Sequence, residues 1–231
     1  AAFGLALKRV QTFGSRGMCM AESSPGRDIR DPHWKPATLH EAPPVGGILG
    51  LYNMSDRNRL YWKCHDCYEW FEAAPGLGLF CLPAEVDLLD EVRSINIEAM
   101  ADHYARVVCP HCGSIHMPKQ KKLLNKNHKW LADGLTIDRY DDIHGEALHS
   151  TIAGYWLGGV AAAFQTWRSI IMRYLQALRQ YALSGMEEAL KNTYNVDQGL
   201  PYISRHLVEA GAKDGDPKDR PDKTLERFVV P

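Results

Sequence analysis

Apolar residues recur at helical spacing in three parts of the chain. Residues 2–12, 84–106 and 167–183 each place an apolar side chain every three or four positions, which is typical of amphipathic helices. The third of these is the clearest, because Thr166 can cap its N-terminus and Gly185 can end it. We therefore predict a long, well-delimited helix over 167–183 and a helical segment within 84–106.

Shorter apolar runs predict strands. Residues 17–22 are almost entirely apolar, as expected for a strand buried on both faces of a parallel sheet. Residues 50–54, 59–63 and 68–71 also have strand-like patterns, and 147–157 is compatible with a buried strand. The runs at 59–63 and 68–71 are close enough to form a hairpin.

Two segments show neither the helical nor the strand periodicity of apolar residues. Residues 26–47 are rich in Pro, Gly, His and charged side chains and predict an irregular surface segment. Residues 209–224 have the composition of a charged, Pro/Gly-rich linker and lead into a short apolar run. The chain also opens on a helical pattern without an initiator Met, so we expect these 231 residues to be part of a larger polypeptide.

The composition is that of an ordinary soluble protein, with 45% hydrophobic and 24% charged residues. The formal net charge of −1 leaves any nucleic-acid contact to local patches rather than to a global field. No run approaches the roughly 20 apolar residues of a membrane span, and no signal-peptide pattern is present.

Four of the six cysteines form two C-x-x-C pairs, Cys64-His-Asp-Cys67 and Cys109-Pro-His-Cys112. Two such pairs can complete a tetrahedral zinc site. Four thiolates leave no open position for water or substrate, so the predicted zinc is structural. The intervening segment 68–108 exceeds the roughly 15–20 residues of a compact finger and indicates an insertion. The pairs favour reduced, intracellular cysteine, with Cys19 and Cys81 as spare thiols.

Two further features carry candidate chemistry. A lysine patch follows the second pair, and it is either a solvated face or a binding surface for DNA phosphates; its members are Lys119, Lys121, Lys122, Lys126 and Lys129. Ser23 and Ser24 follow the apolar run 17–22. They are either simple turn residues or hydroxyls that sense a nucleotide at the carboxyl end of a strand.

Several catalytic patterns are excluded. The sequence contains no G-x-x-x-x-G-K-[ST], no H-E-x-x-H and no G-x-S-x-G motif. His144-Gly-Glu146 follows the cysteine pairs, whereas zinc deaminases place H-x-E before them. The scattered aspartates provide no convincing pair for a metal-dependent nuclease.

Six segments occur along the chain in the same order as the corresponding motifs of one known family. They are Leu7-Lys-Arg-Val-Gln-Thr-Phe13, Met18-Cys-Met-Ala-Glu-Ser-Ser-Pro25, the two cysteine pairs, Leu123 to Ala132, Ile152-Ala-Gly-Tyr-Trp-Leu-Gly-Gly159 with Trp167, and Asn192-Thr-Tyr-Asn with Gly199-Leu-Pro-Tyr202. Together they resemble the large subunit of lambda-type phage terminases, the ATP-driven motor and endonuclease that packages DNA. The resemblance covers nearly the whole chain.

The resemblance implies an α/β fold, the C-terminal part of a P-loop-type ATPase sheet with an inserted four-cysteine zinc ribbon and following helices. Its boundaries would be 1–58 for the ATPase-like part, 59–132 for the ribbon with its helical insertion, 133–208 for a strand-and-helix block, and 209–231 for a linker toward a nuclease domain. Ser23 and Ser24 would then belong to the family's coupling motif, which reports the γ-phosphate state.

The same resemblance implies ATP and Mg²⁺ as cofactors of the parent protein only. Because neither active site is complete in these residues, we expect no ATPase or nuclease activity from them. The implied partners are double-stranded DNA, the terminase small subunit and the portal, with a homo-oligomer as a further option and the host cytoplasm as the location. The alternative is a stand-alone, non-catalytic zinc-ribbon module that binds nucleic acid or a protein partner.

Overall fold

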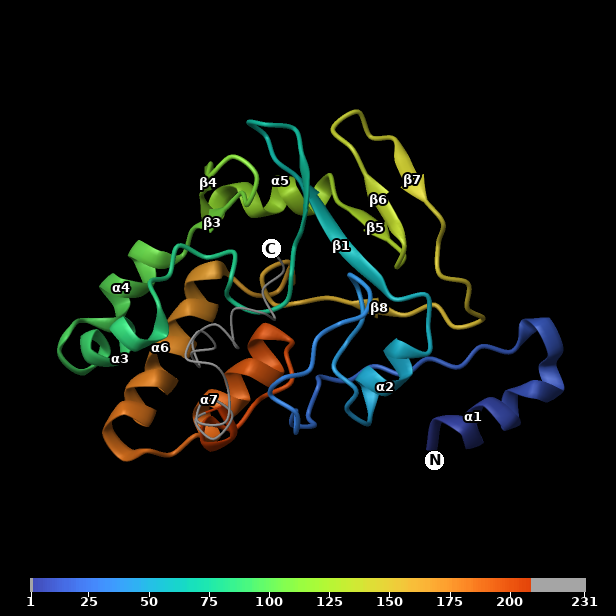
Figure 1. Cartoon of the computed structure of the whole chain (residues 1–231), viewed down its shortest axis with the longest axis horizontal. Helices are drawn as coiled ribbons and strands as arrows, with labels where there is room; N and C mark the ends of the chain where they lie inside the picture. Colours follow the sequence, from blue (N-terminus) through green and yellow to red (C-terminus); the bar gives the residue numbers. More distant parts are fainter. Residues whose placement is uncertain (1, 209–231) are drawn as a thin grey trace.

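The computed structural model describes residues 2–208 and combines helices with small, mainly antiparallel sheets (Figure 1). The helical elements are α1 (Ala2–Val10), η1 (Gln11–Arg16), α2 (Ile48–Asn53), α3 (Glu85–Ser94), α4 (Ile97–Tyr104), η2 (Pro118–Gln120), α5 (Lys121–Lys126), α6 (Trp167–Ser184), α7 (Glu188–Asn192) and η3 (Thr193–Gln198). The strands are β1 (Asn58–Lys63), β2 (Trp70–Glu72), β3 (Val107–Val108), β4 (Ile115–His116), β5 (Lys129–Leu131), β6 (Leu135–Ile137), β7 (Ile143–Gly145) and β8 (Tyr155–Trp156).

Strand β1 is the centre of the largest sheet. It pairs antiparallel with β2 and with β5, and in parallel with β8. Alternate β1 side chains enter different clusters: Leu60 and Trp62 face the main core, whereas Tyr61 packs with Trp70 and Leu131. The strand is therefore buried on both faces, and the predicted hairpin over 59–63 and 68–71 is confirmed.

The predicted helices form the block beside this sheet. Helices α3 and α4 occupy the 84–106 region and pack against α6. The apolar face of α6, which the helical spacing predicted, is buried. It comprises Ile170, Ile171, Tyr174, Leu175 and Leu178. The Thr166 side chain accepts the Ser169 N–H, and Gly185 ends the helix at φ 72°. The helix and both of its predicted caps are confirmed.

One main core joins the sheet to the helices. The Trp62 ring lies against Phe71 at 6.1 Å and against Trp167 at 6.2 Å between centroids. Both Trp62 and Trp167 are fully buried. The indole N–H groups are satisfied, since Trp62 donates to the Asn125 side chain and Trp167 donates to the Val160 carbonyl. The first residue of α6 is thus packed against Trp62, near the C-terminal end of β1.

Two predicted strands are wrong. Residues 17–22 form no strand, and Met18 and Met20 are 83% and 79% exposed, because no described strand or helix lies along this segment to pair with it or cover it. Residues 48–53 form helix α2 instead of a strand, with Leu49 and Tyr52 buried one helical turn apart. The local apolar pattern at 50–54 fits either element, and packing against Trp156 selects the helix.

The remaining fold expectations are met only in part. Within 147–157, only Tyr155–Trp156 pairs as a strand, and Leu148 is 40% exposed. The small sheets of the described chain do not identify a P-loop ATPase sheet, so the fold is a mixed helix-and-sheet arrangement with a four-cysteine cluster. The predicted linker 209–231 lies outside the described residues. Among the described helices, none combines the length and apolarity needed to cross a bilayer.

Candidate metal centre

Two hairpin tips present the four paired cysteines. The first tip joins β1 to β2, where Cys64 donates its N–H to the Glu69 carbonyl and Tyr68 donates to the Cys64 carbonyl. The second tip joins β3 to β4, where Cys109 donates to Ser114 and Gly113 donates to Cys109. The fourth residue after the leading cysteine has a positive φ in both, 63° at Tyr68 and 73° at Gly113. The two tips therefore share one backbone turn, which glycine adopts freely and Tyr68 adopts with strain.

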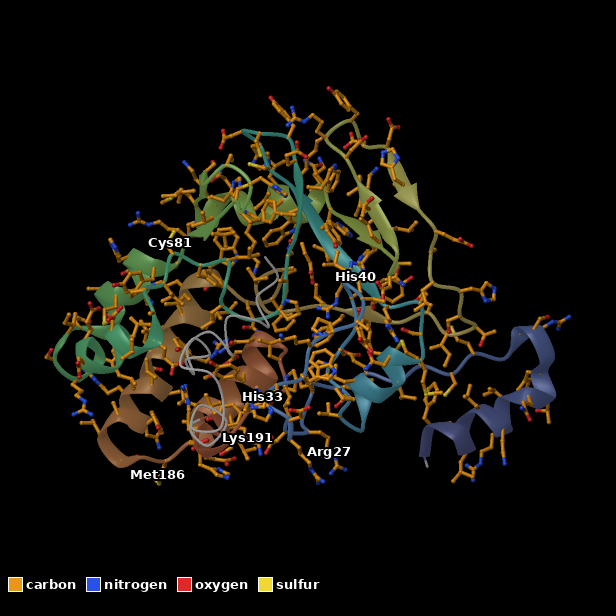
Figure 2. All side chains as sticks on the ribbon, viewed as in Figure 1. Arg27, His33, His40, Cys81, Met186 and Lys191 are labelled. Carbon is orange, nitrogen blue, oxygen red and sulfur yellow. The ribbon has the colours of Figure 1, made fainter. Side chains whose placement is uncertain are left out.

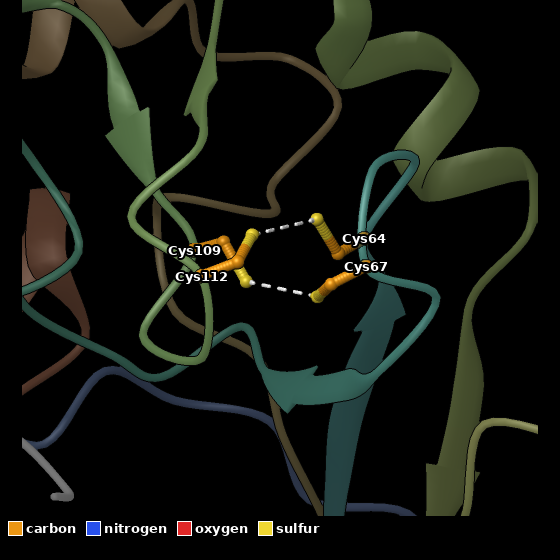
Figure 3. A group of neighbouring side chains, drawn as sticks. All are labelled: Cys64, Cys67, Cys109 and Cys112. Carbon is orange, nitrogen blue, oxygen red and sulfur yellow. Dashed lines mark hydrogen bonds between the residues drawn. The ribbon is translucent and has the colours of Figure 1, made fainter.

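The turns bring the four sulfurs together, as Figure 3 shows. All four Sγ atoms lie within 4.8 Å of one another. The Cys64–Cys112 and Cys67–Cys109 sulfurs are each 3.8 Å apart, and all four thiols are free of disulfides. A tetrahedral ion with metal–sulfur bonds of about 2.3 Å requires sulfurs about 3.8 Å apart. The donor set thus fits one tetrahedral metal ion and provides no further ligand position.

The environment of the sulfurs is uneven. Cys64 and Cys109 are buried, Cys67 is half-buried and Cys112 is exposed. Burial raises the pKa of the Cys64 and Cys109 thiols, whereas a hydrogen bond from the Ser114 backbone lowers the pKa of Cys112. A bound cation would offset the cost of burying the first two as thiolates.

Interactions between the hairpins support the cluster from outside. His111 Nε2 lies 2.9 Å from the Trp70 carbonyl, and Ser114 donates to the Asp66 carboxylate. His116 is fully buried and stacked on Phe71, and burial lowers the pKa of His116. Its two ring nitrogens have no hydrogen-bond partner within the described chain. His116 is outside the four-thiol group and packs beside it in the core.

The predicted coupling residues lie away from this cluster. Ser23 and Ser24 are exposed, and the Ser23 hydroxyl donates to the Ser24 carbonyl at 3.0 Å. Together with α2, β8 and Phe164 they line a hollow of about 570 Å³. Their turn does not end a strand, because the preceding apolar run is not paired.

The lysine patch separates into two kinds of side chain. Lys119, Lys122 and Lys126 are exposed, and Lys129 is half-buried with its ammonium 5.5 Å from the Trp70 ring centroid. Lys121 is buried instead. Its Nζ donates to the Ala162 carbonyl at 2.8 Å, to Gln165 at 2.7 Å and, at 3.5 Å, to Gly159. The Lys121 ammonium is therefore not free to bind a phosphate, and this corrects its inclusion in the predicted lysine patch.

A buried ion pair was not anticipated from the sequence. Arg59 Nη1 lies 3.2 Å from Glu72 Oε1, its Nε donates to the Tyr52 hydroxyl, and its guanidinium lies 3.9 Å from the Trp156 ring centroid. Burial raises the pKa of Glu72, and the Arg59 charge opposes that shift. The β1–β2 pairing brings these opposite charges together. Their spacing along the chain therefore could not predict the ion pair.

The fold and the cluster together define the class of this protein. It is a mixed helix-and-sheet protein with a four-cysteine cluster formed by two hairpin tips. Comparison with protein families then identifies it. Residues 1–130 match the family described as phage terminase large subunit gpA, ATPase domain, and residues 152–231 match the terminase large subunit gpA, endonuclease domain. The chain belongs to the phage terminase large subunit gpA family, as its motifs predicted. Neither a curated protein nor a solved structure was found to match it.

The two matched regions are not separate bodies in the fold. All four cysteines, β1 and α3–α4 fall within 1–130, whereas β8, α6 and α7 fall within 152–231. Strand β8 pairs with β1, and α6 packs on α3 and α4 (Figure 1). The ATPase-matched and endonuclease-matched segments thus share the main core.

Proposed function

We propose that this chain forms the hub between the ATPase and endonuclease parts of a DNA-packaging terminase large subunit, with Zn²⁺ as a structural ion at Cys64, Cys67, Cys109 and Cys112. The observation that carries the proposal is the four-thiol cluster itself, set in a chain matched by both enzyme domains. These matches also favour the terminase assignment over an unrelated zinc-ribbon binding module.

The packing around the cysteines supports a structural role for a metal ion in such a hub. Cys64 and Cys109 are members of the main core, which also contains Trp167 and Leu175 of the endonuclease-matched α6. The hairpins themselves are short, since β3 and β4 have two residues each. Strands of this length do not hold their register alone. Zinc bound to both tips would fix the two hairpins relative to each other and to α6.

The coupling role of Ser23 and Ser24 belongs to the same proposal. Both hydroxyls lie on an ATPase-matched turn, and the hollow they line is also lined by Tyr155, Leu157 and Phe164 of the endonuclease-matched segment. A change at the ATP–Mg²⁺ site of the complete motor would reach this turn and bias the packing between the two halves.

The partners follow from the family and from the charged surface. Lys119, Lys122, Lys126 and Lys129 are proposed to bind double-stranded DNA beside the metal module. The terminase small subunit, the portal and further copies of the large subunit are the proposed protein partners, in the host cytoplasm. Without a P-loop motif, these 231 residues alone are expected to hydrolyse no ATP.

The zinc assignment is tested by metal content. Cys109→Ser should lose the single bound zinc per chain and lower the thermal midpoint of the ribbon, because three thiolates and a hydroxyl bind zinc far more weakly. Cys81→Ser is the matched control, since Cys81 is half-buried and outside the cluster. Atomic-emission analysis of purified chains provides the readout, and full zinc occupancy in Cys109→Ser would contradict the assignment.

The role of the lysines in DNA binding is tested separately, by titrating labelled duplex DNA at several salt concentrations. Replacing Lys119, Lys122 and Lys126 together by Gln should flatten the dependence of log K on log salt, by about 0.9 for each phosphate that is no longer neutralised. An unchanged slope rules the patch out as a DNA-binding surface without affecting the zinc assignment.

A further inference from the structure

A second positively charged surface lies apart from the lysine patch. A hollow of about 670 Å³ is lined by the irregular segment 26–31, by residues 44–47 and by Lys191 of α7. Figure 2 labels Arg27 and Lys191 on neighbouring parts of this face. The hollow therefore combines cations from the ATPase-matched and the endonuclease-matched regions.

Some of the charged side chains around this hollow have partners and others do not, within the part of the chain that the structure describes. Asp28 pairs with Lys191 at 2.8 Å, and Asp31 Oδ1 accepts the His33 N–H at 2.9 Å. Arg27 and Arg30 are exposed, and neither has an ion pair or side-chain hydrogen bond within residues 2–208. The Asp28 carboxylate is thus paired with a cation and one oxygen of Asp31 accepts a backbone N–H, whereas no residue within 2–208 uses the donors of the two guanidinium groups.

The backbone that carries the two arginines is anchored. Ile29, which lies between them, is only 3% exposed, packs with Ile203 and Val208, and donates its N–H to the Tyr202 carbonyl at 2.9 Å. The ion pair of Asp28 with Lys191 holds the same stretch to α7. The arginine positions are therefore set by buried neighbours, which lowers the entropy that a ligand must overcome to order them.

Two glycines form part of the lining beside Arg27. Gly46 and Gly47 line the hollow without side chains, and Gly47 has φ +82°, a conformation that favours glycine. A Cβ at Gly47 would lie 3.8 Å from Arg27 Cγ, so the stem of Arg27 runs directly beside this backbone. A side chain here would contact the stem of Arg27.

We infer that Arg27 and Arg30 bind phosphoryl groups of a DNA backbone at the junction of the two enzyme-matched regions, while Lys191 remains paired with Asp28. Guanidinium groups bind phosphate oxygens in a bidentate manner, and exposed arginines on a fixed backbone, without an ion pair among residues 2–208, suit this role. The inference rests on the proposed function for DNA as the source of the phosphate. A nucleotide phosphate shares the same chemistry and is the alternative source.

The test measures anisotropy of a fluorescein-labelled duplex of about 20 bp with the full 231-residue chain between about 50 and 300 mM salt. The double variant Arg27→Gln/Arg30→Gln should weaken binding and reduce the magnitude of the log K against log salt slope by about 1.8, which is about 0.9 for each of the two phosphates released. Arg27→Gln alone should show about half of this reduction. Arg27→Lys should retain most of the slope, since it keeps the charge.

Arg93→Gln is the matched control. Arg93 is an exposed arginine of α3 without an ion pair among the described residues, and its replacement removes the same charge elsewhere. Its slope should equal that of the unmodified chain. Zinc content and circular dichroism of each variant establish that folding is unchanged.

Three results would overturn the inference. An unchanged slope in the double variant, with the unmodified chain binding duplex normally, removes this site but leaves the proposed function intact. Absence of duplex binding by the unmodified chain removes both the site and DNA as a direct partner of this segment. Loss of fluorescent ATP-analogue binding in the double variant, with duplex binding unchanged, assigns the arginines to a nucleotide instead.

Discussion

The buried ammonium of Lys121 is one of the links between the two enzyme-matched regions, and it acts through hydrogen bonds to carbonyl oxygens. It projects from α5, and its three carbonyl acceptors belong to the 159–165 segment that leads into α6. Replacing Lys121 by Met keeps the unbranched stem and removes the donor. The Gln165 carbonyl then loses its side-chain donor, whereas the Ala162 carbonyl keeps the Gln165 N–H at 3.2 Å.

The expected loss in the free energy of unfolding follows from the hydrogen bonds that the substitution removes. Hydrogen bonds to a charged group contribute about 1.5–3 kcal/mol each, and the bond at 3.5 Å is too long to count fully. Two strong bonds are therefore removed. Removing the charge relieves its desolvation, which is the cause that lowers the pKa of Lys121 to about 8. The expected net loss in free energy of unfolding is about 2 to 4 kcal/mol.

Urea denaturation followed by tryptophan fluorescence measures this loss, because Trp167 and Trp62 report on the core beside the link. With a slope of about 2 kcal/mol per molar urea, the midpoint should fall by roughly 1 to 2 M. Lys122→Met is the matched control: the neighbouring lysine is exposed, and its substitution should change the free energy of unfolding by less than about 0.5 kcal/mol.

Equal midpoints for the two variants would refute this reasoning. They would mean that the Lys121 ammonium exchanges its carbonyl partners for water at no cost. The connection between α5 and the start of α6 would then depend on apolar packing and on the hydrogen bond from the Asn125 side chain to the Ala161 carbonyl.

Two further predictions concern His40, a buried residue of the irregular segment 26–47 that lies 2.8 Å from the Tyr61 hydroxyl of β1, and the long helix. Burial, together with the Arg59 charge, lowers the pKa of His40 to about 4, below the value near 6.5 of the unfolded chain. The unfolded chain therefore binds more protons in this range, and up to about 3 kcal/mol of stability present above about pH 6.5 is lost as the pH falls toward 4. His40→Gln should reduce this loss in urea unfolding at about pH 7 and pH 5, and an identical pH dependence would exclude His40 as its source. Thr166→Ala removes the acceptor of the Ser169 N–H and should cost about 1 kcal/mol in thermal or urea unfolding. Ser94→Ala, an exposed position at the end of α3, should cost much less, and equal costs would mean that the cap contributes nothing.

The elements predicted well from the sequence are those governed by near neighbours. The β1–β2 hairpin, the helices within 84–106 and helix α6 with its caps follow from period and terminal residues, which act over about four positions. The four thiols follow from C-x-x-C spacing, since a single turn can orient both cysteines of a pair. The order of short motifs was sufficient to indicate the family.

Tertiary structure decided the features that depend on which segments meet. Lys121 and Lys122 are adjacent and chemically identical in the sequence, yet one is buried against the 159–165 carbonyls and the other is exposed. Arg59 meets Glu72 only through strand register, and Arg27 shares a hollow with Lys191 only because Ile29 is buried beside the C-terminal segment. The apolar run 17–22 has the pattern of a buried strand but no described neighbour to bury it. Burial and pairing are properties of two surfaces that meet, so the pattern of one segment determines what it can pack against, and the folded chain determines whether it does.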